Sequence, residues 1–248
     1  MIKALIFDFG GTLDANGTHW LERTYQFIKK HHPEITRDQF DKADRATISE
    51  FAFGDASVEW SYQDGSMLPV GAVANREAAE CSLRETVGAI GTGVFKRLAL
   101  SDQLKDEYVK WFCNGVTENL TSNREWLKSL YGNYVLGVIS NNFGNTRGWC
   151  DEFQLTPLLD VIIDSTVFGA SKPDPSIFNA ALTEINVTPS EAIYVGDSYS
   201  ADMIGAKKVG MWTAWMIGNQ QKECPDLSVV DVQLNHLHEL TDFLSRIP

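Results

Sequence analysis

The first fourteen residues, MIKALIFDFGGTLD, constrain the fold more than any other stretch of the chain. The apolar run Ile2–Phe7, broken by one lysine, has the length and composition of a strand that is buried in a parallel sheet. It ends at Asp8, and Gly10 and Gly11 then allow the backbone to turn sharply and to approach whatever this carboxylate faces. Because open α/β sheets bind ligands at the carboxyl ends of their strands, Asp8 is a candidate site residue. A plain strand followed by a glycine turn would explain the same stretch.

Three later stretches carry polar side chains at comparable places. The first is the end of an apolar run, VLGVIS. The second, ASKPDPSIF, lies just before a predicted helix, and the third is the end of another apolar run, IYVGD. They contribute Ser140 and Asn141, then Lys172, then Asp197 with Asp202 shortly after it. Taken one at a time, a turn, a solvated loop charge and an acid in the first turn of a helix explain these residues well. In a parallel sheet, however, the strand ends meet at one edge, which would bring them close to Asp8.

The chain thus carries, in order, a carboxylate, a hydroxyl, a lysine and a pair of carboxylates. This order resembles the four motifs of the haloacid-dehalogenase superfamily of hydrolases, most of which are phosphatases. The resemblance covers the chain at about residues 1–13 and 123–248. It implies an α/β fold with a doubly wound, Rossmann-like parallel sheet formed by residues 1–14 and 123–248. It also implies an inserted α-helical cap domain, residues 15–122.

The resemblance assigns catalytic roles to three of these residues. Asp8 would be the nucleophile that attacks phosphorus and becomes an aspartyl phosphate, which is a reaction open to carboxylates. Ser140 would donate a hydrogen bond to a phosphoryl oxygen, and Lys172 would neutralise the charge that builds up in the transition state. Thr12 and Asn141 would complete the phosphate-binding site beside them.

The resemblance also implies a metal site. A carboxylate and a phosphate repel each other, so a divalent cation is needed between them, and ligands that are all oxygen suit Mg²⁺. The ligands would be Asp8, the backbone carbonyl of Gly10 and Asp197, with Asp202 close by or acting through water.

One departure from the family pattern affects the expected chemistry. Phosphatases of this family carry a second aspartate two residues after the nucleophile, as general acid and base, and that position is Gly10 here. Glycine keeps the carbonyl but cannot move a proton, and the loss of such a group costs roughly 10²–10⁴ in rate. Asp14 is the nearest carboxylate in the sequence, and we expect it to point towards the cap. Slow turnover, a good leaving group, or a donor from the cap or substrate would each fit.

Hydrophobic periodicity predicts helices in the cap and alternating strands and helices after it. The predicted cap helices are Trp20–His32, Thr36–Phe53, a stretch around Asn75–Thr86 and Ser101–Gly115, with no strand pattern from Ala15 to Leu120. In the core, the predicted strands after the first are Tyr134–Ile139, Leu158–Asp164, Ala192–Val195, Met211–Ile217 and Ser228–Val232. The predicted core helices are Asn123–Tyr131, Asn145–Phe153, Pro175–Ile185, Tyr199–Val209 and Leu237–Leu244.

Composition narrows the possible partners and location. The net charge of −12 disfavours binding to a nucleic-acid backbone, and no apolar stretch is long enough to span a membrane. The four cysteines are far apart in the chain, without metal-ligand spacing, and are most simply free thiols in a reducing cytoplasm.

We therefore expect a Mg²⁺-dependent hydrolase that acts on a small phosphorylated metabolite. One alternative is a dehalogenase-like displacement at carbon, because a halide leaves without a proton. The family's dehalogenases work without a metal, however, and the intact pair Asp197 and Asp202 argues against that reaction. A second alternative is a non-catalytic protein that binds a phosphorylated metabolite. The substrate's identity and the oligomeric state remain open at this level.

Overall fold

A six-stranded parallel sheet forms the centre of the fold in the computed structural model, which describes residues 1–55, 76–220 and 223–247. The strands lie in the order β3-β2-β1-β4-β5-β6. Their bounds are β1 (Ala4–Phe7), β2 (Val135–Ser140), β3 (Val161–Asp164), β4 (Ala192–Gly196), β5 (Trp212–Met216) and β6 (Val232–Leu234). All the pairings are parallel, and the predicted doubly wound α/β fold is thus confirmed.

The chain changes direction across the sheet at β1. It adds β2 and β3 on one side of this strand and then returns to place β4, β5 and β6 on the other. Phe7 is in register with Val138 of β2 and with Val195 of β4, so these three strands end at nearly the same level. A doubly wound sheet opens a crevice at the carboxyl ends of strands where the winding reverses, which is where Asp8 lies.

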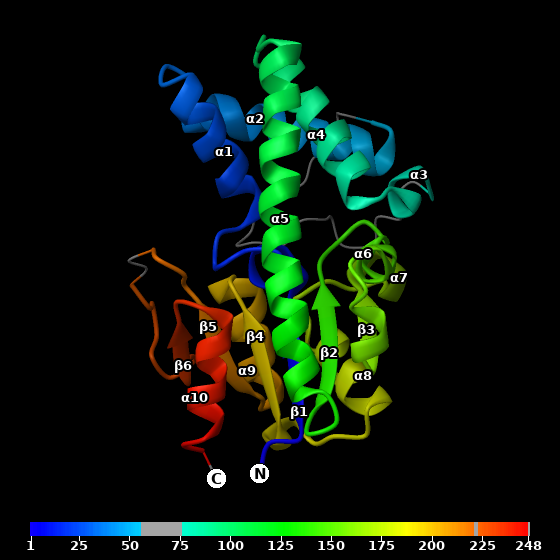
Figure 1. Cartoon of the computed structure of the whole chain (residues 1–248), viewed down its shortest axis with the longest axis vertical. Coiled ribbons are helices and arrows are strands. Elements are labelled where there is room, and N and C mark those ends of the chain that lie inside the picture. Colours follow the sequence, from blue (N-terminus) through cyan, green and yellow to red (C-terminus); the bar gives the residue numbers. More distant parts are fainter. Residues whose placement is uncertain (56–75, 221–222, 248) are drawn as a thin grey trace.

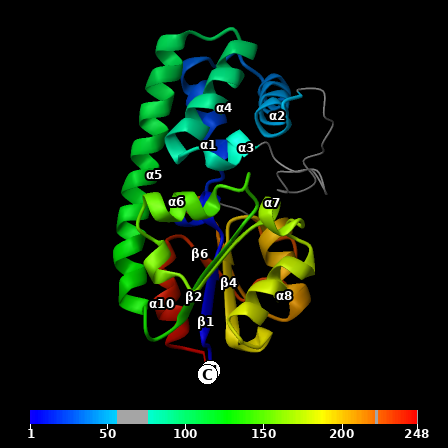
Figure 2. The same cartoon turned by 90° about the vertical axis from the view of Figure 1, so that its right-hand side faces the viewer.

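Helices cover both faces of the sheet (Figures 1 and 2). On one face, α8 (Pro175–Glu184) and α9 (Ile204–Val209) pack against Ala4 and Ile6 of β1. On the other face, α10 (Leu240–Leu244) and the second half of α5 (Asp102–Leu130) pack against Leu5 and Phe7. Because β1 is covered on both faces, all of its side chains are buried, which explains its unbroken apolar sequence.

The remaining helices lie beyond the carboxyl ends of the strands (Figure 1). They are α1 (Trp20–His31), α2 (Arg37–Phe53), α3 (Arg76–Glu80) and α4 (Leu83–Arg97), with the first half of α5 packed against α4. Two short helices follow β2 and β3, namely α6 (Thr146–Glu152) and α7 (Ser165–Phe168). Residues 15–55 and 76–120 contain no strand, as the sequence predicts; the part of that prediction on residues 56–75 lies outside the described residues. No helix in the described ranges combines the length and the apolar character needed to span a membrane.

The two helices predicted at Ser101–Gly115 and Asn123–Tyr131 are a single helix, so that prediction was wrong. Gly115 and the β-branched residues that follow it favour a break, yet α5 continues through this segment and is 29 residues long. Val116 and Leu120 extend the buried stripe of this helix, and burial of these side chains outweighs the weak local propensity. The predicted domain boundary between residues 122 and 123 lies inside α5, and it stays a prediction.

Two other predicted elements are displaced. The helix predicted around Asn75–Thr86 is divided, because Ser82 forms a capping box with Glu85 and begins α4 at the next residue. The strand predicted at Ser228–Val232 begins only at Val232, since Asp226 accepts a hydrogen bond from the backbone N–H of Ser228 in a turn, at 2.8 Å.

Candidate active site

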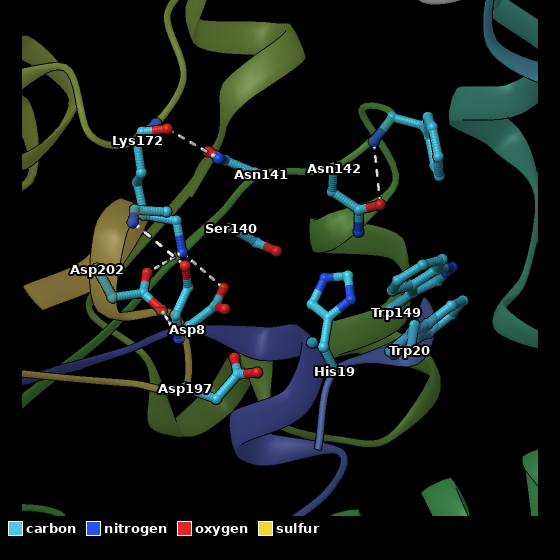
Figure 3. Close-up of a pocket in the computed structure, with 14 residues that line it drawn as sticks. Asp8, His19, Trp20, Ser140, Asn141, Asn142, Trp149, Lys172, Asp197 and Asp202 are labelled. Atoms are coloured by element: carbon cyan, nitrogen blue, oxygen red, sulfur yellow. Dashed lines mark hydrogen bonds and ion pairs between the residues drawn. The ribbon is translucent and has the colours of Figure 1, made fainter. Parts of the chain in front are cut away.

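Lys172 lies between two buried aspartates, Asp8 directly after β1 and Asp202 in the helical turn Tyr199–Met203 that follows β4. Its Nζ is 2.8 Å from Oδ1 of Asp8 and 2.7 Å from Oδ1 of Asp202. The same Nζ donates a hydrogen bond to the hydroxyl of Tyr194, at 2.9 Å, and this hydroxyl donates in turn to the carbonyl of Ile139. The ammonium group is therefore held by three contacts although its side chain is almost completely buried (Figure 3).

Asp8, Asp197 and Asp202 form a compact cluster of buried carboxylates. Each offers an oxygen atom, and these three atoms lie within 4.8 Å of one another. Two glycines make room for them, since a Cβ on Gly11 would lie 2.4 Å from the Asp197 carboxylate and one on Gly196 would lie 2.3 Å from that of Asp202. Gly11 also has a φ of +84°, which favours glycine independently. The residue types at both positions thus follow from the carboxylates beside them.

Burial dominates the electrostatics of this cluster. The pKa of Asp8 is raised to about 7: desolvation is the largest cause and Asp202 adds to it, while Lys172 acts in the opposite direction. Burial alone would lower the pKa of Lys172, but Asp202 and Asp8 outweigh that effect and raise it. With all groups ionised, three carboxylates face one ammonium group, an excess of two negative charges. Buried oxygen ligands with this excess fit a divalent cation such as Mg²⁺.

The loop after β2 holds the lysine segment in place. The side-chain amide of Asn141 donates to the carbonyl of Lys172 at 3.1 Å and accepts from its backbone N–H at 2.9 Å. Asp164 accepts from the backbone of Gly144 and Thr146, and so fixes the same loop at the end of β3. Ser140, the last residue of β2, is buried at the edge of the pocket. The phosphate-binding role of Asn141 stays a prediction, but its side chain also positions Lys172.

One pocket brings together most of the predicted residues. Asp8, Gly10, Ser140, Asn141, Lys172, Asp197 and Asp202 all line it. Thr12 does not: it is fully buried in the turn Phe9–Leu13, and its hydroxyl has no hydrogen-bond partner in the part of the chain that the structure describes. Its predicted contact with phosphate is not tested by this geometry.

Asp14 turns away from the pocket and is fully buried between the core and α1. Its carboxylate accepts hydrogen bonds from the backbone N–H of Gly11 and from the indole N–H of Trp20, and it lies 3.4 Å from the Arg23 guanidinium. Burial raises the pKa of this carboxyl group, while Arg23 lowers it. Asp14 is therefore a structural link to the cap, as its expected direction suggested, and it is not among the residues that line the pocket.

The pocket also has an aromatic side that sequence reasoning did not identify. We use this name for His19, Trp20, Phe143 and Trp149 (Figure 3). The two indole rings stack with their centroids 5.3 Å apart and their planes at 11°. A Cβ on Gly10 would lie 3.6 Å from Trp20, so the indole occupies the space next to the missing aspartate. Trp20 and Trp149 look like ordinary core residues of amphipathic helices, and no sequence pattern separates them from such residues.

Comparison with known proteins agrees with this geometry. The model of the haloacid dehalogenase-like hydrolase family matches residues 2–210. The chain belongs to this family. Among its curated relatives is a glyceraldehyde 3-phosphate phosphatase of Pyrococcus furiosus, to which this haloacid dehalogenase-like chain is 31% identical over 154 residues. That match covers 55% of this chain and 63% of the relative. It is 33% identical over 131 residues to a ribulose-1,5-bisphosphate 5-phosphatase of Halopiger xanaduensis, covering 49% and 55%. The matches thus span less than two thirds of these relatives.

Solved structures show the same fold over the whole chain. A HAD phosphatase from Thermococcus onnurineus shares 22% identity with a TM-score of 0.54, and the match covers 98% of each chain. An L-2-haloacid dehalogenase from Xanthobacter autotrophicus shares 15% identity with a TM-score of 0.58, and the match covers 100% of each chain. At these identities the comparison establishes the fold, and the chemistry has to be argued from the site.

Proposed function

We propose that the protein is a Mg²⁺-dependent hydrolase that removes phosphate from a small phosphorylated metabolite through an aspartyl-phosphate intermediate on Asp8. The observation that carries this proposal is the cluster of Asp8, Asp197 and Asp202 with Lys172 inserted between two of its members. A buried nucleophile, a cation beside it and an excess of negative charge are together suited to phosphoryl transfer assisted by a divalent metal.

The proposed roles follow from position. Asp8 attacks phosphorus, and Lys172, already in contact with this carboxylate, stabilises the negative charge on the transferring group. Ser140 donates a hydrogen bond to a phosphoryl oxygen from the end of β2. Asp8, Asp197, Asp202 and the carbonyl of Gly10 would hold Mg²⁺, which when bound would offset the charge of the carboxylates and of the phosphate.

The substrate class is proposed from two supports. Two of the curated relatives carry the names of phosphatases of small phosphorylated molecules. The net charge of −12 disfavours a nucleic-acid partner. The cytoplasmic location expected from the cysteines stays a prediction.

The test is phosphate release from a panel of phosphorylated metabolites, with Mg²⁺ and with excess chelator. We expect activity only with Mg²⁺, and Asp8→Asn should abolish it because an amide is a far weaker nucleophile than a carboxylate. Asp151→Asn, which makes the same change at an exposed carboxylate of α6, should retain the parent rate.

Three results would contradict the proposal. Full hydrolysis in excess chelator would remove the metal from the mechanism. Release of halide from a 2-halo acid without metal, in the absence of phosphate-ester hydrolysis, would support displacement at carbon, for which the missing acid at Gly10 is no handicap. Tight binding of phosphorylated ligands without turnover of any of them would identify a non-catalytic binding protein.

A further inference from the structure

The pocket lacks the expected proton donor, and the structure brings a different polar group to the aromatic side. Gly10 has no side chain, and Asp14 is turned away and used in three buried contacts. His19 lines the same pocket as Asp8 and Ser140, and Figure 3 shows its imidazole projecting into the pocket between the carboxylates and the stacked tryptophans. This residue lies in the connection to α1, immediately before the helix begins.

The connection that carries His19 is held on both sides. Before it, the backbones of Gly17 and Gly218 approach so closely that a Cβ on Gly218 would lie 2.0 Å from the carbonyl oxygen of Asn16. The Thr18 hydroxyl accepts a hydrogen bond from Gln220 at 2.9 Å. After it, Trp20 is fixed by Asp14 and by stacking on Trp149. The imidazole is therefore presented from a constrained backbone, as a preorganised catalytic group requires.

The hydrogen bond between His19 and the first turn of α1 favours one tautomer of the ring. As the N-cap of α1, its Nδ1 accepts a hydrogen bond from the backbone N–H of Leu21, at 3.3 Å. A neutral imidazole carries its hydrogen on one nitrogen only, so an accepting Nδ1 places the hydrogen on Nε2. The ring thus presents a neutral N–H donor.

We propose that His19 replaces the missing general acid with a hydrogen bond: its neutral Nε2–H binds the leaving-group oxygen, and the product alcohol departs as an anion. This inference rests on the proposed phosphatase function. The bond from the Asp8 oxygen to phosphorus forms while the bond from phosphorus to the leaving oxygen breaks. The electron pair of the broken bond stays on that oxygen, no proton leaves His19, and the anion takes its proton from water. The substrate class that fits is a phosphate ester of an acidic alcohol, such as a phenol or an enol.

Two amide variants separate this role from helix capping. Asn places its amide near the position of Nδ1 and is a good N-cap, whereas Gln reaches the position of Nε2 and keeps an N–H donor there. We compare kcat/KM, which reports on the first chemical step, for benzyl phosphate and 4-nitrophenyl phosphate. His19→Asn should lower the value for benzyl phosphate about 100-fold, the typical effect of one lost transition-state donor. For 4-nitrophenyl phosphate, whose leaving group delocalises its charge, the loss should stay below about 10-fold.

A second variant of His19, a control histidine and an NMR measurement complete the test. His19→Gln should stay within about 10-fold of the parent for both esters, and His236→Gln, a change at an exposed histidine, should have no effect. Larger losses in His19→Gln than in His19→Asn, or equal losses for the two esters, would overturn the inference and leave the phosphatase function standing. A parent that hydrolyses neither these esters nor the metabolite panel would instead overturn the proposed function. Nitrogen-15 NMR provides a readout without turnover, because a hydrogen on Nδ1 of His19 in the resting protein would also refute the proposal.

Discussion

The two sides of the pocket are built on different physical grounds. The charged side, Asp8, Lys172, Asp197 and Asp202, is almost completely buried, and its members are held by contacts with one another and with backbone at the strand ends. The aromatic side, His19, Trp20, Phe143 and Trp149, is held by packing and by one buried carboxylate, Asp14. On the charged side the ammonium group of Lys172 offsets the carboxylates of Asp8 and Asp202, whereas on the aromatic side the packing of the rings sets the arrangement.

This difference predicts how each side responds to substitution. A buried charge that loses its partner destabilises the fold strongly, because nothing else compensates it. The loss of an aromatic contact or of a single hydrogen bond costs less unfolding free energy. Three substitutions test the comparison.

The largest effect is expected for Lys172→Met, which removes the cation between Asp8 and Asp202. Loss of one partner of a buried ion pair costs about 3–5 kcal/mol of unfolding free energy, and turnover should be abolished. Lys207→Met, which breaks an ion pair with Asp231 at a partly exposed site, should cost no more than about 1 kcal/mol. Urea denaturation of the parent and both variants measures the difference, and equal costs would show that the charged side is no more demanding than the surface.

The same variant has a pH dependence with a defined sign. Burial already raises the pKa of Asp8 to about 7 with the lysine present, so its charged form is disfavoured in the folded state. A raised pKa favours the fold at low pH, and this contribution is lost as the pH rises through that value. The loss of unfolding free energy caused by Lys172→Met should therefore become smaller as the pH falls from about 8 to about 5. At the higher pH, added Mg²⁺ should also reduce this loss. A cost that grows on acidification would contradict this account.

A smaller effect, confined to rate, is expected for Gly10→Asp. Gly10 has φ −74° and ψ 124°, which any residue can adopt, and the nearest atoms to a new Cβ belong to Trp20 at an ordinary contact distance of 3.6 Å. The variant should fold, with a melting temperature close to that of the parent. Since the new carboxyl group can protonate the leaving group and activate water, alkyl esters should gain about 10²-fold and aryl esters less. Any burst of the aryl product should also shrink.

The contrast between ester types is the informative part of that experiment. The parent should favour aryl over alkyl phosphates strongly, because a phenolate leaves without a proton. A gain of the same size for both esters, or no gain at all, would mean that the leaving group already receives its proton from another group of the pocket.

The smallest effect is expected for Asp14→Asn, at the base of the aromatic side. Asparagine keeps one acceptor oxygen, but its N–H₂ group faces hydrogen-bond donors that the second carboxylate oxygen now accepts from. We therefore expect a loss of about 1–3 kcal/mol of unfolding free energy. Asp41→Asn is the matched control, because Asp41 pairs with Arg37 on the surface at 2.7 Å, where such a pair contributes up to about 1 kcal/mol. Thermal unfolding compares the two, and a cost for Asp14→Asn no larger than that of the control would show that the aromatic side does not depend on this carboxylate.

The sequence by itself determined the architecture and the charged side of the pocket. Short apolar runs followed by a polar residue have a clear pattern, and the parallel arrangement then brings Asp8, Ser140 and Asp197 to one edge. The local signals for helices were sufficient in α1, α2 and α8, where caps and apolar spacing agree. They failed at residues 116–122 of α5, because burial against other helices keeps the helix intact where local propensity does not.

Only the tertiary structure decided the aromatic side and the place of Asp14. His19 and Trp20 are close to Asp14 in the chain, yet which of these side chains enters the pocket depends on the direction in which the backbone leaves the turn Phe9–Leu13. That direction is fixed by the approach of Gly17 to Gly218, more than two hundred residues away in the chain. The positions of Trp149 and Tyr194 are likewise set by packing between distant elements. Contacts of this range leave no periodic signal in a single sequence, because they depend on shape and volume and not on a repeated pattern of residue types.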